Sequence, residues 1–133
     1  MASNTSPIFG LTAFFAGSNS SAANTNRDGT GVLVPLFSTG TNTSRVDRIN
    51  IKYTVTTTVG MFRIFIYDTV NNYLWHEIPV DAVTVAASTP GFEYEMRNMD
   101  GSALAWFPPN YTIKFTTHNA ENVNASANGW HYT

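Results

Sequence analysis

Apolar and polar residues alternate in short runs along most of the chain, and no segment keeps a helical period over several turns. The runs are rich in Thr, Val, Ile, Phe and Tyr, the residue types that favour strands. Gly, Asn, Asp and Pro gather between them, as is typical of turns. The pattern predicts about eight strands, separated by turn residues as in a sandwich or barrel, at 11–16, 32–38, 45–58, 61–68, 73–80, 92–96, 111–117 and 123–132.

Two positions disturb the alternation and predict local irregularities. Val46 and Ile49 are both apolar but three residues apart, so we expect a bulge near Asp47 and Arg48. Pro35 lacks the backbone N–H that a sheet ladder needs, which places its strand at an edge or beside a bulge.

Segment 61–68 is apolar on both faces, with Phe62 on one face and Phe65 and Tyr67 on the other. Such a strand is either central in its sheet or covered on its outer side by a partner. We therefore take Phe62, Phe65 and Tyr67 as candidate contact residues.

The spacing of the strands favours an antiparallel sandwich of the jelly-roll type, with an extended N-terminal arm. An immunoglobulin-like sandwich is the alternative, although the Cys–Trp–Cys signature of antibody domains is absent. The length of 133 residues suits one domain. We expect residues 1–30 to form an arm, or a first strand plus a polar loop, and residues 31–133 to form the sandwich.

Composition narrows the possible partners. The formal net charge is −2 and only 12% of residues are charged, so we expect no basic face and no nucleic-acid partner. There is no cysteine for a disulfide or a Cys-based metal site. The N-terminus lacks the pattern of a signal peptide, and the apolar stretch 8–16 is too short to span a bilayer, so we expect no membrane partner.

Every candidate for catalysis or metal binding in the sequence is incomplete. Residues 24–29 match the first half of a calcium-binding loop, but its last ligand position falls on Pro35. Glu93 and Glu95 lie on one strand face, where paired carboxylates are usually solvated. The three histidines, His76, His118 and His131, have no metal-ligand spacing. We expect no enzyme activity, no catalytic residue, no cofactor and no metal.

The aromatic residues leave two interpretations open. Trp75, Trp106 and Trp130 could form a platform for sugars, or they could serve core and protein–protein packing. The C-terminal residues Trp130, His131 and Tyr132, together with Trp106, are candidate interface residues on the second interpretation.

Charged residues stand where a turn enters the long strand, at Arg45, Asp47 and Arg48. Their opposite charges could pin the turn locally or form ion pairs across a subunit contact, and we include all three among the candidate interface residues.

Four stretches follow one another in a more specific order than composition explains: 26–31 (NRDGTG), 41–49 (TNTSRVDRI), 77–80 (EIPV) and 117–121 (THNAE). With the strands between them, they resemble a family of small phage structural proteins encoded among head genes. The resemblance covers roughly residues 24–125.

The resemblance implies a virion component on the head surface, a capsid decoration or cement protein that is not an enzyme. It implies the major capsid protein and further copies of the chain, as a homotrimer, as partners. On this hypothesis the N-terminal arm docks on a neighbouring capsid subunit. The alternatives are a tail, neck or fibre domain with a receptor- or carbohydrate-binding role, and an unrelated enzyme or binding module.

Overall fold

The computed structural model describes residues 12–132, and every regular element within them is a strand. The strands are β1 (Thr12–Ser20), β2 (Val34–Ser38), β3 (Ser44–Tyr53), β4 (Gly60–Tyr67), β5 (Asn72–Val80), β6 (Glu93–Arg97), β7 (Ala105–Phe107), β8 (Thr112–Thr117) and β9 (Val123–His131).

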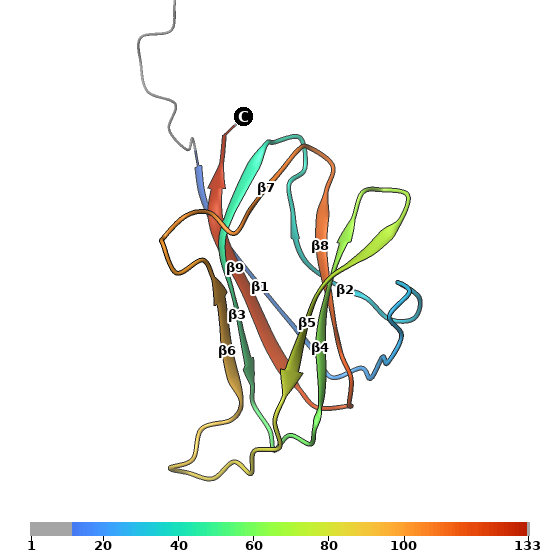
Figure 1. The fold of residues 1–133 in the computed structure, drawn as a ribbon, viewed down its shortest axis with the longest axis vertical. Coiled ribbons are helices and arrows are strands. Elements are labelled where there is room, and N and C mark those ends of the chain that lie inside the picture. Colours follow the sequence, from blue (N-terminus) through green and yellow to red (C-terminus); the bar gives the residue numbers. More distant parts are fainter. Residues whose placement is uncertain (1–11, 133) are drawn as a thin grey trace, which may run out of the picture.

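The strands form two antiparallel sheets that pack face to face (Figure 1). One sheet has the order β1-β9-β3-β6, with the short β7 also paired to β3, and we name it sheet A. The other, sheet B, has the order β2-β8-β4-β5. This interleaved order is that of a jelly roll. The prediction of an all-β antiparallel sandwich is confirmed.

Both predicted irregularities are present. The register between β3 and β9 shifts between Val46 and Arg48. Pro35 lies on β2, the edge strand of sheet B, and the register with β8 shifts between Pro35 and Phe37. A proline and a break in the apolar period therefore located two bulges correctly.

Most strand boundaries lie within two residues of the predictions, and three features differ by more. β1 runs on to Ser20 and β3 ends at Tyr53. The short strand β7 lies in a segment that we expected to be a loop, because three residues before Pro108 carry too little alternation to signal a strand. β7 pairs with β3 alongside β6.

The core lies between the two sheets and takes the inward residues of both. Phe62 and Ile64 of β4 are fully buried in it, and the rings of Phe62 and Phe115 stack with their centres 5.3 Å apart. Burying each such side chain stabilises the fold by about 1.5–3 kcal/mol. The prediction of Phe62 as a contact residue is wrong, because its ring belongs to this core.

Phe65 is also fully buried, but on the other side of the sheet. β4 is a central strand of sheet B, and Phe65 shares its outward face with Arg63. The polar loop 21–33 extends across this face, from a bridge between Ala23 and Thr117 on β8 to a salt bridge between Arg27 and Glu77 on β5 (Figure 1). The prediction of Phe65 as a subunit contact is therefore wrong: the chain covers this strand with its own loop.

Asn24 fixes the shape of that loop. Its side-chain Nδ2 donates to the carbonyl oxygens of Thr30 and Val32, at 3.0 and 2.9 Å, and its Oδ1 accepts from the N–H of Asn26 at 2.9 Å. The resemblance of 24–29 to a calcium loop thus reflects a turn whose backbone groups are hydrogen-bonded by the Asn24 side-chain amide.

The sandwich begins before the polar loop rather than after it. β1 pairs with β9 along its whole length, from Thr12 opposite His131 to Ser20 opposite Val123. Phe14 of β1 stacks on Phe37 of β2 with ring centres 4.0 Å apart, which joins the two sheets along one side. Of the predicted segment 1–30, residues 12–20 are thus part of the sandwich, and residues 1–11 lie outside the described residues.

Candidate functional site

The outward face of sheet A carries most of the candidate surface residues. Along each strand of the sheet alternate side chains point away from the core. The outward positions are held by Phe15, Gly17 and Asn19 on β1, by Asn124, Ser126, Asn128 and Trp130 on β9, by Arg45, Arg48, Asn50 and Lys52 on β3, and by Glu93, Glu95 and Arg97 on β6.

One end of this face holds an aromatic cluster around an arginine. Trp106 on β7 and Trp130 on β9 lie directly opposite Arg45 on either side of β3. The Arg45 guanidinium lies 5.8 Å from the ring centres of both Trp106 and Tyr132, which themselves are 5.0 Å apart. Trp106 is 57% exposed and Trp130 is 37% exposed. We name Arg45, Trp106, Trp130 and Tyr132 the aromatic–arginine cluster.

The charges beside the cluster are paired within the chain. Nε of Arg45 lies 2.8 Å from Oδ1 of Asp47, and Nη1 of Arg48 lies 3.1 Å from Oε1 of Glu95. Arg45 and Asp47 thus pair locally, whereas Arg48 pairs with β6 of the same sheet. Ion pairs across a subunit contact stay a prediction. The pairing with Asp47 holds the Arg45 guanidinium between its aromatic neighbours.

The other candidate residues lie elsewhere. His131 points inward, where its Nδ1 is 2.7 Å from the Ser44 hydroxyl and its ring packs against Phe14. Tyr67 lies on the outward face of sheet B, with Nζ of Lys114 3.9 Å from its ring centre. The fold thus brings six predicted residues together and separates four. The six are Arg45, Asp47, Arg48, Trp106, Trp130 and Tyr132.

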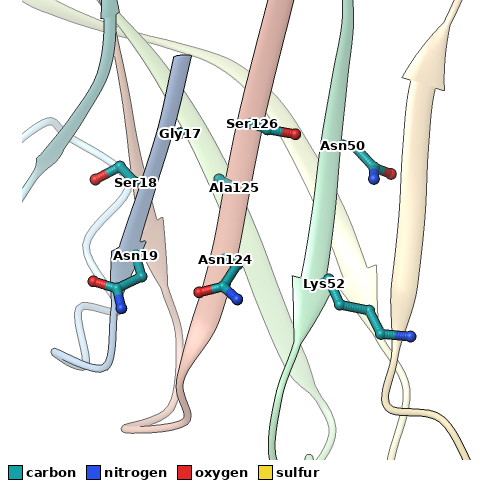
Figure 2. A pocket seen from close by; sticks show the side chains of 8 residues that line it. All are labelled: Gly17, Ser18, Asn19, Asn50, Lys52, Asn124, Ala125 and Ser126. Atoms are coloured by element: carbon teal, nitrogen blue, oxygen red, sulfur yellow. The ribbon is translucent and has the colours of Figure 1, made fainter. Parts of the chain in front are cut away.

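A hollow of about 500 Å³ lies further along the same face (Figure 2). It crosses three neighbouring strands and is lined by Gly17, Ser18, Asn19, Asn50, Lys52, Asn124, Ala125 and Ser126. Figure 2 shows the Asn19, Asn124 and Lys52 side chains side by side on β1, β9 and β3. The hollow exists because the outward positions of β9 and β1 are small here, with Ser126 and Gly17 at its floor.

A second hollow of about 320 Å³ continues from the first, and the two share Asn50 and Ser126. The second is lined by Phe15, Arg48, Asn50, Glu93, Glu95, Ser126 and Asn128. Phe15, 77% exposed, stands at the β1 side of this hollow. We name the two hollows together the polar groove.

A third hollow of about 340 Å³ adjoins the second at Arg48 and reaches Trp106. The polar groove therefore leads along sheet A toward the aromatic–arginine cluster.

Short and long side chains give the groove its shape and its charge. The short residues of β9 form the floor, and charged residues of β3 and β6 form one wall. In that wall Nζ of Lys52 is 3.3 Å from Oε2 of Glu93, and Glu95 pairs with Arg48 on one side and Arg97 on the other. Each cation along the wall therefore faces a carboxylate.

The strongest carboxylate network lies on the opposite sheet. Glu77 accepts from Arg27 Nη2 at 2.6 Å and from Arg63 Nε at 3.0 Å, and Arg63 Nη1 lies 3.3 Å from His118 Nδ1. The hydrogen bond from Arg27, with that from Arg63, holds the pKa of the Glu77 carboxyl below its ordinary value. This network fastens the covering loop to sheet B over the buried Arg63.

The polar groove was not predicted from the sequence. Its floor is formed by Asn124, Ser126 and Asn128, which alternate with buried small residues along the predicted strand 123–132. Short polar residues at every second position indicate a strand whose outward side chains extend only a short distance from the sheet. That signal alone does not show which strands lie beside it.

Among residues 12–132, no three His, Asp or Glu side chains are grouped to hold a metal ion. The described residues include no helix long and apolar enough to cross a membrane.

Comparison with protein-family models, with curated proteins and with solved structures finds no match to this chain. What bears on function is therefore the aromatic–arginine cluster, the polar groove and the sequence resemblance over residues 24–125.

Proposed function

We propose that this chain is a structural protein of a phage particle, a decoration or cement protein that binds the outside of the head. On this proposal its partners are the major capsid protein and other copies of itself, as a homotrimer. The sequence resemblance suggests the location. The observation that supports binding to another protein is the aromatic–arginine cluster at one end of sheet A.

The cluster has the composition of a protein-binding hot spot. Trp, Tyr and Arg dominate the binding energy of protein interfaces, because large rigid side chains bury much area at little entropic cost. Trp106 and Trp130 leave large apolar surfaces in water in the described chain. A partner that covers both rings gains binding energy from a small area.

Shell stabilisation follows from binding energy that exists only in the assembled particle. A protein that binds the closed shell and not the separated subunits stabilises the shell by mass action. A trimer has three equivalent contacts, and each contact that forms raises the effective concentration for the next.

The copy number of the chain in purified particles tests the proposed location. We expect a fixed stoichiometric ratio to the major capsid protein, measured by quantitative mass spectrometry, because decoration follows the symmetry of the shell. A copy number far below that of the capsid protein would contradict a head location and favour the tail, neck or fibre alternative.

The cluster is tested by the double variant Trp106→Ala, Trp130→Ala, bound to particles that lack the protein. We expect a loss of affinity of about tenfold or more, since hot-spot truncations cost about 2 kcal/mol or more. Tyr73→Ala is the matched control, because Tyr73 is an exposed aromatic residue of β5 in the other sheet. Equal binding by both variants would exclude the cluster as the contact.

The arm hypothesis requires a deletion that ends before β1. Removing residues 2–16 would delete half of β1 and the stack of Phe14 on Phe37. Deletion of residues 2–11 leaves β1 complete, and we expect it to lower particle occupancy. Unchanged occupancy would contradict the arm hypothesis while leaving the cluster in place.

A further inference from the structure

We propose that the polar groove of sheet A is a binding site for a neutral polysaccharide chain. This inference goes beyond the proposed contact function, and it holds for a head protein as well as for a fibre domain. It rests on the shape of the groove, its hydrogen-bonding groups, its charge balance and its one exposed aromatic ring.

The shape suits an extended polymer. The two hollows of the groove follow one another along the sheet and share Asn50 and Ser126, so a chain ligand can lie across both. Small-molecule sites, in contrast, enclose most of their ligand. The groove is an open surface feature that contacts one side of a ligand over several sugar units.

Four side-chain amides in the groove are free to bind a ligand: those of Asn19, Asn50, Asn124 and Asn128. Among residues 12–132 none of these amides has a side-chain hydrogen-bond partner in the chain. Each amide offers two donors and an acceptor. A sugar hydroxyl both donates and accepts, so neighbouring amides can bind pairs of hydroxyls.

The charges of the groove favour a neutral ligand. Lys52 is paired with Glu93, and Arg48 with Glu95, so the two cations and two carboxylates that line the hollows cancel. Arg97, which also approaches Glu95, lines the third hollow instead. A site without excess charge gains nothing from long-range attraction to a polyanion. These pairs nevertheless place donors beside acceptors, which again matches hydroxyl groups.

Phe15 supplies the apolar element that such a site needs. Its ring is 77% exposed and borders the hollow that contains Asn128 and the Arg48–Glu95 pair. The face of a pyranose ring that carries C–H groups can stack on an aromatic ring, whose large apolar surface is otherwise in contact with water. Phe15 and the amides thus present apolar and polar surfaces to the same sugar.

A protein or nucleic-acid partner fits the groove less well. The cores of protein interfaces are depleted in charged residues, and a partner that covered the groove would bury unpaired amides at a cost in free energy. A nucleic acid requires excess positive charge to replace its counterions. The aromatic–arginine cluster, in contrast, has the composition that suits a protein.

Titration of the ¹⁵N-labelled protein with hexasaccharides tests the proposal. The neutral probes are hexamers of glucose, mannose, galactose and N-acetylglucosamine, and the acidic probe is a hexamer of galacturonic acid. We expect at least one neutral probe to shift the side-chain amide signals of Asn50 and Asn124 in a saturable way. Shifts with the acidic probe alone, shifts confined to sheet B, or no shifts would each overturn the proposal.

Three variants locate the site. Ser126→Tyr places a large side chain on the floor shared by both hollows, and we expect it to abolish the shifts. Phe15→Ala removes an exposed ring without disturbing the core, and we expect at least a tenfold weaker affinity. Tyr73→Ala on sheet B should bind as the unchanged protein does. Full binding by both groove variants would overturn the proposal.

Failure of this proposal is distinguishable from failure of the proposed function. The sugar titration uses the isolated protein, whereas the copy number is measured in particles. A chain that binds hexasaccharides but is scarce in particles would support the groove and contradict the head location.

Discussion

Single residues determine how the polar loop covers sheet B. Asn24 is buried, and its amide satisfies two carbonyl groups and one N–H of the loop. Glu77 connects the loop to Arg63, which is itself almost completely buried. A buried guanidinium needs such a partner, because an unpaired charge in the interior is costly.

We expect Asn24→Ala to destabilise the domain by about 1–3 kcal/mol, because the carbonyls of Thr30 and Val32 lose their donor. Urea unfolding measures this change. Asn26→Ala is the matched control: its Nδ2 donates to Thr30 Oγ1 at an exposed site, so we expect a change within about 0.5 kcal/mol. An equal loss of unfolding free energy in both variants would show that the Asn24 amide does not hold the polar loop in its shape.

Glu77 should make stability depend on pH in the acid range. Its folded-state pKa is below the ordinary value of 4.5 because Arg27 and Arg63 stabilise the carboxylate. The stabilisation is therefore complete above pH 4.5 and is lost as the pH falls through the lowered folded-state pKa. Glu77→Gln removes this contribution at all pH values.

The measurement is the urea midpoint of both proteins across the acid range. We expect the unchanged protein to be more stable at neutral pH and the difference to shrink below pH 4.5. A gap between the two proteins that stays constant into strong acid would contradict a role for the charge.

At the scale of elements, the backbones of β9 and β3 approach closely at the bulge of β3. Gly129 lies opposite Val46 at the bulge, and a Cβ on Gly129 would overlap the carbonyl oxygen of Arg45. The close approach of the two backbones aligns Arg45 with Trp130 on the outward face. A glycine inside a strand often marks such a contact.

Gly129→Ala should therefore destabilise the domain by about 1–3 kcal/mol or more, since the added methyl group forces the strands apart. Thermal unfolding measures the loss. Gly17→Ala is the control within sheet A, because a Cβ there meets only the Ala125 oxygen at 3.8 Å. A glycine in a strand costs about 0.5–1 kcal/mol relative to alanine, so Gly17→Ala should be neutral or stabilising.

The whole molecule depends on how the two sheets join along one side. β1 belongs to sheet A and β2 to sheet B, and the Phe14–Phe37 stack connects them. The neighbouring residue Phe15 points outward into the groove. Two adjacent phenylalanines thus serve the core and the surface, as the alternation along a strand requires.

We expect Phe14→Ala to cost about 2–3 kcal/mol, less than a fully buried phenylalanine, because the ring is partly exposed. Phe15→Ala should change stability by no more than about 0.5 kcal/mol. Urea midpoints of the two variants decide the point. Comparable destabilisation by Phe15→Ala would show that its ring has a structural role and weaken its use in the sugar titration.

The fold class follows from the sequence alone, because strand chemistry and turn residues are local signals. The break between Val46 and Ile49 and the position of Pro35 located two bulges for the same reason. The resemblance to phage structural proteins, the trimer and the head location stay predictions.

Which surfaces are available to a partner depends on the packing of the whole chain. Phe65 has the same apolar signal whether a partner or the chain's own loop covers it, and a loop reaching from β8 to β5 is not a local property. Likewise Arg45, Trp106 and Trp130 became neighbours, and Asn50 joined Ser126 in the groove, through pairing of strands far apart in sequence. Local alternation determines which side of a strand a residue faces, but only strand order determines which residues lie beside it.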